Sequence, residues 1–304
     1  MQSGKSTVFR RPQGLQKRAG SLLGSLVVYL LLIEFIFVFL YPFLFMIVNS
    51  LKFDADFRDL NRQWVLTGLN LENYKTAFQL LDYSSTVLVN LVVVLVATVG
   101  HVFSCSFIAY GVARYSFKGR TLIFVLIILS ILVPPVLIQM PLYIQFSRMQ
   151  WIGTILPIVV PAFFGFGLKG GLYIFIFMQF FRGLPRSYEE AAKIEGCGGV
   201  SAYLRIMLPL SKTSILVVST LSIIWHWNDS FEPTAFLSVG NVKMLTQRLA
   251  SIPEYLYQST TASGVVISPV QLAACMLIIL PLIIMYGFIQ KRFMQGMEFS
   301  GLAN

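Results

Sequence analysis

The chain is 304 residues long, 56% of its residues are hydrophobic, only 12% are charged, and its mean hydropathy is +0.75. Because soluble proteins carry roughly 25% charged residues, this composition excludes an ordinary soluble domain and indicates an integral membrane protein. The net charge is +10, and we expect it to reflect the two sides of a membrane rather than a nucleic-acid partner.

Six apolar segments are long enough to cross a bilayer, for which a helix needs about 20 residues. They lie at residues 21–48, 86–112, 121–146, 157–181, 213–231 and 270–290. The first is too long for a secretory signal and contains Glu34, so we expect it to remain as an anchor. Prolines in the third and fourth segments predict helices that are kinked or partly unwound. The sequence therefore predicts an all-α integral membrane protein with six transmembrane helices.

Basic residues are unevenly shared between the two sides that six spans define. The side with both termini has fifteen basic and four acidic residues, whereas the other has seven basic and eight acidic residues. Since Lys and Arg accumulate in cytoplasmic segments, we predict that both termini are cytoplasmic. The predicted organisation is a basic tail (1–20), a first helix with its outer loop (21–85), a five-helix core (86–293) with a cytoplasmic loop (183–211), and a C-terminal tail (294–304).

The cytoplasmic loop has the most specific pattern in the chain. Residues 187–190, Ser-Tyr-Glu-Glu, have the form of a capping box, in which the first hydroxyl and the last carboxylate bond each other's backbone amides. Ala191, Ala192 and Gly196 predict a surface open to close approach and a tight turn, and Pro209 ends a second helix. We therefore predict a compact helix–turn–helix suited to a groove on another protein, in which Glu190 also has a capping role.

The complete spacing is Glu-Ala-Ala, three residues, Gly, nine residues, Ile, one residue and Leu-Pro. It resembles the coupling loop of ATP-binding-cassette (ABC) importer permeases, specifically carbohydrate-uptake permeases similar to the smaller membrane subunit of the maltose system. Segments 227–231 and 290–296 are also similar to that family, and the likeness covers about residues 70–300. The resemblance implies a type I importer permease fold in a bacterial inner membrane. It implies ATPase contact by Glu189, Glu190, Ala191, Ala192, Gly196, Ile206, Leu208 and Pro209.

The same resemblance implies partners. Such a permease works beside a second, similar permease, two cytoplasmic ATPase subunits and an extracytoplasmic solute-binding protein. We expect this chain to form half of a translocation pathway for a carbohydrate, with ATP and magnesium bound by the ATPase subunits. The chain itself is expected to catalyse no reaction and to hold no cofactor or metal, and membrane lipid is its remaining expected partner.

Lys169 is the clearest ionisable residue within a predicted span, close to Gly165, Gly167, Gly170 and Gly171. Ionisable residues at this depth usually face a cavity or a partner, and glycines let the backbone line a cavity closely. Lys169 is therefore a candidate for the substrate pathway, where a cation would favour an acidic sugar such as an alginate oligosaccharide. The alternative is a side chain that extends from a kinked segment towards the membrane surface.

Trp227, Asn228 and Asp229 combine an aromatic face with polar groups, a composition suited to sugar rings, so we predict that they line the pathway. For Trp227, an interfacial aromatic belt is at least as good an explanation. His101 and His226 have no Glu or Cys at metal-ligand spacing, so we expect them to be polar groups in helix packing.

Two other classes of function stay open. A secondary transporter or channel is disfavoured because the chain is short and has no detectable internal repeat. A membrane enzyme is disfavoured because no set of His, Cys, Ser or carboxylate groups converges in the sequence. The loop at 183–211 favours a permease that depends on an ATPase.

Overall fold

The computed structural model describes residues 13–257 and 268–299, so residues 1–12 and 300–304 of the two predicted terminal tails lie outside it. Within these ranges every regular element is a helix. Two bent helix pairs, residues 120–132 with 135–148 and residues 199–210 with 212–228, could each count as one membrane span, which gives up to five spans. Three single helices are long and apolar enough to cross a membrane. The three are α1 (Gln13–Ser50), α4 (Tyr83–Arg114) and α15 (Pro269–Phe299).

Breaks in the helices occur at the prolines and glycines of the third and fourth predicted spans. The third consists of α5 (Arg120–Leu132) and α6 (Pro135–Arg148), which meet at an angle of 100°. The fourth is divided into α7 (Leu156–Ala162) and α8 (Gly170–Gly183) by residues with left-handed backbone at Gly165, Gly167 and Lys169. Left-handed residues cannot continue a right-handed helix. The prediction of kinked or unwound spans is confirmed.

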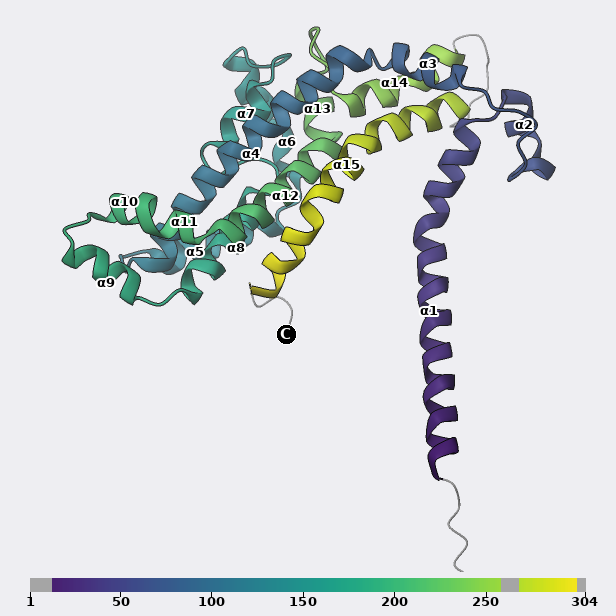
Figure 1. Cartoon of the computed structure of the whole chain (residues 1–304). Helices are drawn as coiled ribbons and strands as arrows, with labels where there is room; N and C mark the ends of the chain where they lie inside the picture. Colours follow the sequence, from purple (N-terminus) through teal and green to yellow (C-terminus); the bar gives the residue numbers. More distant parts are fainter. Residues whose placement is uncertain (1–12, 258–267, 300–304) are drawn as a thin grey trace, which may run out of the picture.

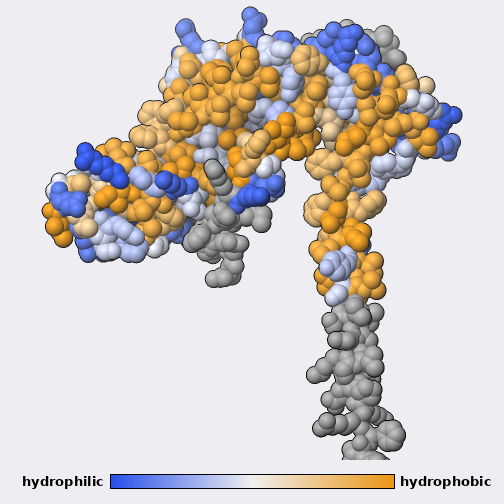
Figure 2. Space-filling view, in the orientation of Figure 1, coloured by the Kyte–Doolittle hydropathy of each residue, from blue (hydrophilic) through white to orange (hydrophobic). Residues whose placement is uncertain are grey.

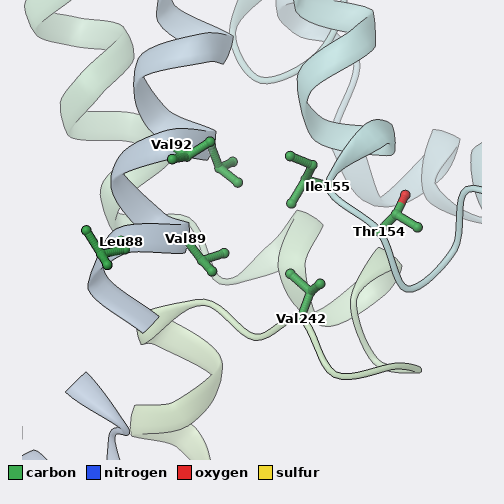
Figure 3. A pocket seen from close by; sticks show the side chains of 7 residues that line it. Leu88, Val89, Val92, Thr154, Ile155 and Val242 are labelled. Atoms are coloured by element: carbon green, nitrogen blue, oxygen red, sulfur yellow. The ribbon is translucent and has the colours of Figure 1, made fainter. Parts of the chain in front are cut away.

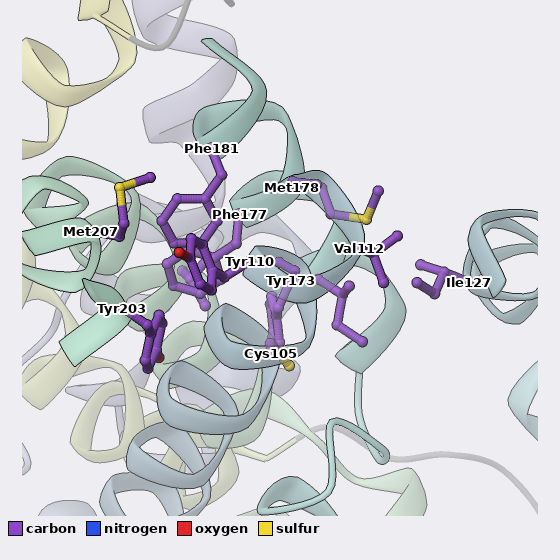
Figure 4. Packing of buried hydrophobic residues seen from close by; sticks show 14 residues of the cluster. Cys105, Tyr110, Val112, Ile127, Tyr173, Phe177, Met178, Phe181, Tyr203 and Met207 are labelled. Carbon is purple, nitrogen blue, oxygen red and sulfur yellow. The ribbon is translucent and has the colours of Figure 1, made fainter. Parts of the chain in front are cut away.

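The central helix of the bundle is α4, which packs against α7, α8 and α12 (Lys212–Asn228) (Figure 1). A Cβ at Gly100 would lie 3.1 Å from the carbonyl carbon of Ala162, so the missing side chain lets α4 approach the end of α7. The C-terminal half of α4 contributes to a buried cluster, shown in Figure 4, whose aromatic members are Tyr110, Tyr173, Phe177, Phe181 and Tyr203.

Most of α1 projects away from the other helices (Figure 1). Its side chains between residues 25 and 44 are exposed, including Phe39 at 71% and the charged Glu34. Buried side chains occur only at its C-terminal end, at Asn49 and Ser50, among those of α1 that the structure describes. Figure 2 shows apolar surface along the projecting part. This helix therefore has an exposed apolar surface that includes one acidic residue, Glu34.

The chain between α1 and α4 contains α2 (Asp54–Arg58), η1 (Leu60–Arg62) and α3 (Glu72–Leu80). Lys52 is buried, and its ammonium donates hydrogen bonds to the carbonyl oxygens of Arg62 and Gln63, both at 2.6 Å. The Asn73 amide donates to the carbonyl oxygens of Ser50 and Lys52, both at 2.8 Å. These bonds tie the end of α1 to the following segment and to α3.

Polar elements gather at two ends of the molecule. The helices α3, α13 (Phe231–Phe236) and α14 (Leu245–Tyr257) lie towards one end, whereas the C-terminal end of α15 and the loop after α8 lie towards the other (Figure 1). Figure 2 shows hydrophilic residues at these ends and apolar surface between them. That distribution suits a protein whose middle lies in a bilayer.

Candidate functional site

The loop identified from the sequence begins with α9 (Ser187–Ile194), but the predicted capping box does not form. Ser187 already has helical backbone, and Arg186 occupies the cap position without a side-chain bond. The Arg186 carbonyl accepts from the amides of Glu189 and Glu190, at 3.0 and 3.1 Å. A side chain can cap a helix only from the residue before the first helical one. The capping-box prediction is therefore wrong, and Glu190 has no capping role.

The end of α9 is a Schellman turn that uses the motif glycine. The Cys197 amide donates to the Ala192 carbonyl at 2.9 Å, and the Gly196 amide donates to the Lys193 carbonyl at 3.0 Å. Gly196 has φ +77°, a conformation that glycine adopts without the steric cost of a side chain. Backbone geometry alone thus explains this glycine, and the predicted turn is confirmed.

The returning arm of the loop consists of α10 (Gly199–Ala202), the π-helical turn η2 (Tyr203–Met207) and α11 (Leu208–Leu210). This arm meets α12 at a bend of 77°. Ile206 and Leu208 are half-buried. Pro209 follows the π-helical turn within one continuous helical run, Gly199–Leu210, so its missing amide removes a helical hydrogen bond there. The arm ends one residue later, so both parts of the expected helix–turn–helix are present.

The tip of the loop exposes both charged and apolar side chains. Glu190 and Ala191 are exposed, whereas Ala192 is buried. Ile194 is 87% exposed and Val200, across the turn, is 59% exposed. An isolated exposed apolar residue needs no explanation, but two beside a turn that also exposes a carboxylate form a surface suited to another protein.

Arg114 is a residue of this site that the sequence analysis missed. Its Nε donates to Glu189 Oε1 at 3.0 Å, and its Nη1 donates to the carbonyl oxygens of Phe181 and Leu184 at 3.1 and 2.8 Å. The side chains of Arg114 and Glu189 are only 6% and 17% exposed, so the Glu189 carboxylate, which the resemblance implied would contact the ATPase, is bound to Arg114 within this chain instead. The two residues are 75 positions apart, so no local sequence pattern pairs them. The one available signal is that Arg114 is a basic residue at the predicted cytoplasmic end of a span.

Lys169 ends the unwound segment before α8, in the left-handed region at φ +63°. Its Nζ lies 4.4 Å from the centroid of the Trp225 ring, within the usual cation–π distance. Lys169 is half-buried and Trp225 is 43% exposed. The structure thus joins a cation on the α7–α8 connection to an aromatic face on α12.

The other three predicted pathway residues have different surroundings. Asn228 is exposed. Trp227 is 2% exposed, and its indole N–H donates to the Ile278 carbonyl at 3.0 Å, which holds α12 against α15. Asp229 is half-buried, and its carboxylate accepts from two backbone amides at the start of α13, at 3.0 and 3.1 Å. Only Asn228 of the three therefore has an exposed side chain in this conformation.

His101 and His226 lie together in the buried region between α4, α8 and α12. Their ring centroids are 5.2 Å apart, and the His101 ring is 5.0 Å from the Tyr173 ring. Nδ1 of His226 lies 2.8 Å from the Ser222 carbonyl oxygen. No three His, Cys, Asp or Glu residues converge as potential metal ligands in the part of the chain that the structure describes. Burial among three helices agrees with the predicted packing role.

An apolar cavity of about 410 Å³ lies beside the N-terminal half of α4 (Figure 3). Figure 3 shows the α4 side chains across from those of the α6–α7 connection and Val242. Thr154 is the single hydroxyl in a lining that otherwise consists of Leu88, Val89, Val92, Val93, Ile155 and Val242. Because a sugar needs several convergent polar groups, this cavity does not suit a carbohydrate.

A helical bundle of membrane-spanning length, with broken helices and a protruding loop on the complete motif spacing, defines the class of membrane transport permeases. Residues 102–299 match the family described as "Binding-protein-dependent transport system inner membrane component", and the chain belongs to this family. The family is one of transport permeases.

Relatives with similar sequences include two proteins of Bacillus subtilis. The "Arabinooligosaccharides transport system permease protein AraQ" is 29% identical over 274 residues, which are 87% of this chain and 91% of the relative. The "Polygalacturonan/rhamnogalacturonan transport system permease protein YtcP" is 25% identical over 90% of this chain and 95% of the relative. The alignments with these two relatives therefore cover nearly the whole of both chains.

A solved structure has the same fold. It is described as the "Crystal structure of a bacterial ABC transporter involved in the import of the acidic polysaccharide alginate", and the match has a TM-score of 0.71. It covers 94% of this chain and 100% of that chain, at 19% sequence identity. At this identity the likeness shows the type I permease fold.

Proposed function

We propose that this chain is the permease subunit of an ATP-driven ABC importer for a carbohydrate, and that it forms half of the translocation pathway. The observation that carries the proposal is the 183–211 loop, because its complete motif forms an exposed helix–turn–helix in a chain of the transport-permease family. The loop would dock on a cytoplasmic ATPase that binds the ATP and magnesium. A second ATPase and an extracytoplasmic solute-binding protein would complete the energy-coupled assembly, with both chain termini cytoplasmic.

The projecting α1 supports a second permease as partner. An apolar helix surface is stable in lipid, but a charged carboxylate at membrane depth is costly without a polar partner. Glu34 is exposed on α1, and no salt bridge to it is found among the described residues. A neighbouring permease that packs on α1 would supply the missing polar group.

The coupling of ATP to transport follows from differential contacts. ATP would favour one arrangement of the ATPase pair, and the docked α9 would move with it. A loaded binding protein would favour one permease state on the opposite side of the membrane. Each ligand can shift the equilibrium between inward-open and outward-open states only by its difference in affinity for those states. The permease in this scheme moves substrate and carries out no chemistry.

The Lys169–Trp225 pair supports an acidic sugar as the substrate. An ammonium on the face of an aromatic ring can still bind a carboxylate with its other N–H groups, and Lys169 Nζ lies 4.4 Å from the centroid of the Trp225 ring. Two of the similar proteins have acidic polysaccharides in their names, polygalacturonan and alginate. We therefore propose a uronate-containing oligosaccharide rather than a neutral one.

The test of the coupling function compares two exposed glutamates, each in the first turn of a short helix. The complex with ATPase subunits and binding protein is purified and reconstituted in liposomes, with Glu190→Ala or Glu72→Ala in this chain. We expect Glu190→Ala to lower ATPase co-purification and uptake at least about tenfold, and Glu72→Ala, on α3, to change both less than twofold. Uptake without any ATPase subunit would contradict the proposal.

The substrate test exchanges the charge at Lys169. Lys169→Met should lower uptake of a labelled uronate oligosaccharide at least about tenfold, because a charge-assisted bond contributes about 1.5–3 kcal/mol. Uptake of a neutral oligosaccharide is measured alongside, and Lys169→Arg, which keeps the cation, is the matched control. Equal uptake of the uronate by both variants would exclude an acidic-substrate role for this lysine.

A further inference from the structure

The base of the 183–211 loop is fastened to the transmembrane bundle by one guanidinium. Arg114 is the last residue of α4, and besides its bonds to Glu189, Phe181 and Leu184, its Nη2 donates to the Pro185 carbonyl at 3.3 Å. Four of the five guanidinium N–H groups are thus used. The acceptors belong to the C-terminal end of α8, the α8–α9 connection and α9. Arg114 therefore links three consecutive parts of the chain to α4.

The electrostatics of this position suit a permanent cation. The last carbonyls of α8 have no amide partners within their own helix, and they carry the negative end of the helix dipole. Arginine stays protonated when buried and spans several acceptors with a rigid fork. The Glu189 carboxylate then balances its charge. A lysine, with a single nitrogen, could not reach all four oxygen atoms at once.

A second contact joins α4 to the returning arm of the loop. The hydroxyls of Ser106 and Tyr203 are 2.7 Å apart, and the ring centroids of Tyr110 and Tyr203 are 5.4 Å apart. Tyr203 is the first residue of η2 and is 1% exposed. A Cβ at Gly199 would lie 2.3 Å from the Tyr115 hydroxyl, so α10 rests directly on the residue that follows α4. Both arms of the loop therefore contact the same end of α4.

Neighbouring glutamates on α9 lie on different sides of the helix. Successive helix residues are about 100° apart around the axis, and Glu190 is exposed while Glu189 is bound to Arg114. One side of α9 is thus available to a partner and the adjacent side is attached to α4, whose other end reaches the opposite side of the bundle. A force applied at Glu190 would be transferred to α4 and α8 through the Arg114–Glu189 pair.

We propose that Arg114 and Glu189 form the joint through which displacement of α9 moves α4 and α8, so that both are positioning residues for coupling. The inference rests on the proposed ATPase docking. It separates docking, which depends on the exposed side of α9, from transmission, which depends on the buried pair. Loss of the pair should therefore uncouple ATP hydrolysis from uptake without releasing the ATPase.

The experiment measures three quantities on the reconstituted full complex: ATPase subunits retained on purification, ATP hydrolysis stimulated by loaded binding protein, and uptake. For Glu189→Gln we expect retention and hydrolysis to fall less than twofold, while uptake per ATP falls about tenfold, within the 5–150-fold range of typical coupling. Glu195→Gln, which removes the same charge from the exposed end of α9, is the matched control and should keep the ratio of uptake to ATP.

A double-substitution test shows whether the two residues act as one unit. Arg114→Gln should lower uptake per ATP at least as much as Glu189→Gln, and the double variant should be no worse than Arg114→Gln alone. If Arg114→Gln fails to fold, as judged by size-exclusion chromatography, Glu189→Gln with Glu189→Asp as the conservative variant carries the test. Glu189→Asp should restore part of the uptake per ATP that Glu189→Gln loses.

The outcomes distinguish this inference from the proposed function. Unchanged uptake per ATP in Glu189→Gln, or a loss of uptake that only parallels loss of ATPase retention, would overturn the joint while leaving the importer function in place. If the unaltered complex retains no ATPase subunit, the proposed function itself fails.

Discussion

The 51–81 segment and the 183–211 loop are both polar excursions from the same helical bundle, at opposite ends of it, yet they use their polar groups differently. In the first, the Lys52 ammonium and the Asn73 amide satisfy carbonyl oxygens of the chain itself. In the second, one buried pair holds the base and the charged residues of the tip are exposed. The first excursion is therefore held rigid by its own hydrogen bonds, whereas the second exposes its charged groups to a partner.

A large loss of stability should come from removing the buried cation of the 51–81 segment. Lys52→Met leaves the carbonyls of Arg62 and Gln63 without their charged donor, and we expect a loss of about 3 kcal/mol in the free energy of unfolding. Lys75→Met is the control, because Lys75 is 66% exposed in its ion pair with Glu72. Chemical denaturation in detergent measures both. Equal stability of the two variants would break the contrast between the rigid and the bound excursion.

A second prediction concerns the pKa of Glu232, which belongs to α13 at the same end of the molecule. Burial raises the pKa of Glu232 from 4.5 to about 8, and the nearby Asp229 carboxylate adds to the rise. Because the folded state holds the proton more tightly, this group favours folding fully below pH 4.5, and that contribution is lost as the pH rises to about 8. Glu232→Gln has no proton to lose, so its free energy of unfolding should not fall in this way. Between pH 4.5 and about 8 the variant should therefore become increasingly more stable than the parent, by up to about 1.4 kcal/mol per pH unit.

Thermal unfolding of the parent and Glu232→Gln at pH 5 and pH 8 measures this effect. The exposed Glu72→Gln is the control. A difference between Glu232→Gln and the parent that stays constant with pH would show that burial does not raise the pKa of Glu232.

The smallest effect should come from the turn of the 183–211 loop. Gly196→Ala forces a side chain into the left-handed region, at a cost of about 1 kcal/mol, and should weaken binding of the ATPase about fivefold. Gly198→Ala is the matched control, since Gly198 has φ −71° and neither position has an atom within 4 Å of an added Cβ. Titration of the ATPase against each purified variant measures the dissociation constant. Equal weakening by both would mean that backbone strain at Gly196 is irrelevant.

Local patterns predicted those parts of the site whose cause is local. The Gly196 turn follows from the backbone freedom of glycine, and the breaks near Pro134 and Gly165 follow from residues that cannot continue a helix. The capping box was wrong because the start of α9 depends on the preceding Arg186 carbonyl, which accepts two of its amides. Trp227 was expected to line the pathway, but it is buried because its indole finds the Ile278 carbonyl on α15.

Apolar length and residue spacing are properties of a single chain, and they were enough to indicate a helical membrane protein with a loop of the importer-permease type. The tertiary structure alone decided which polar groups meet. Arg114 and Glu189, and likewise Lys169 and Trp225, are brought together by helices distant in sequence. Their distances depend on how those helices pack, and packing is set by many side chains at once rather than by any local spacing.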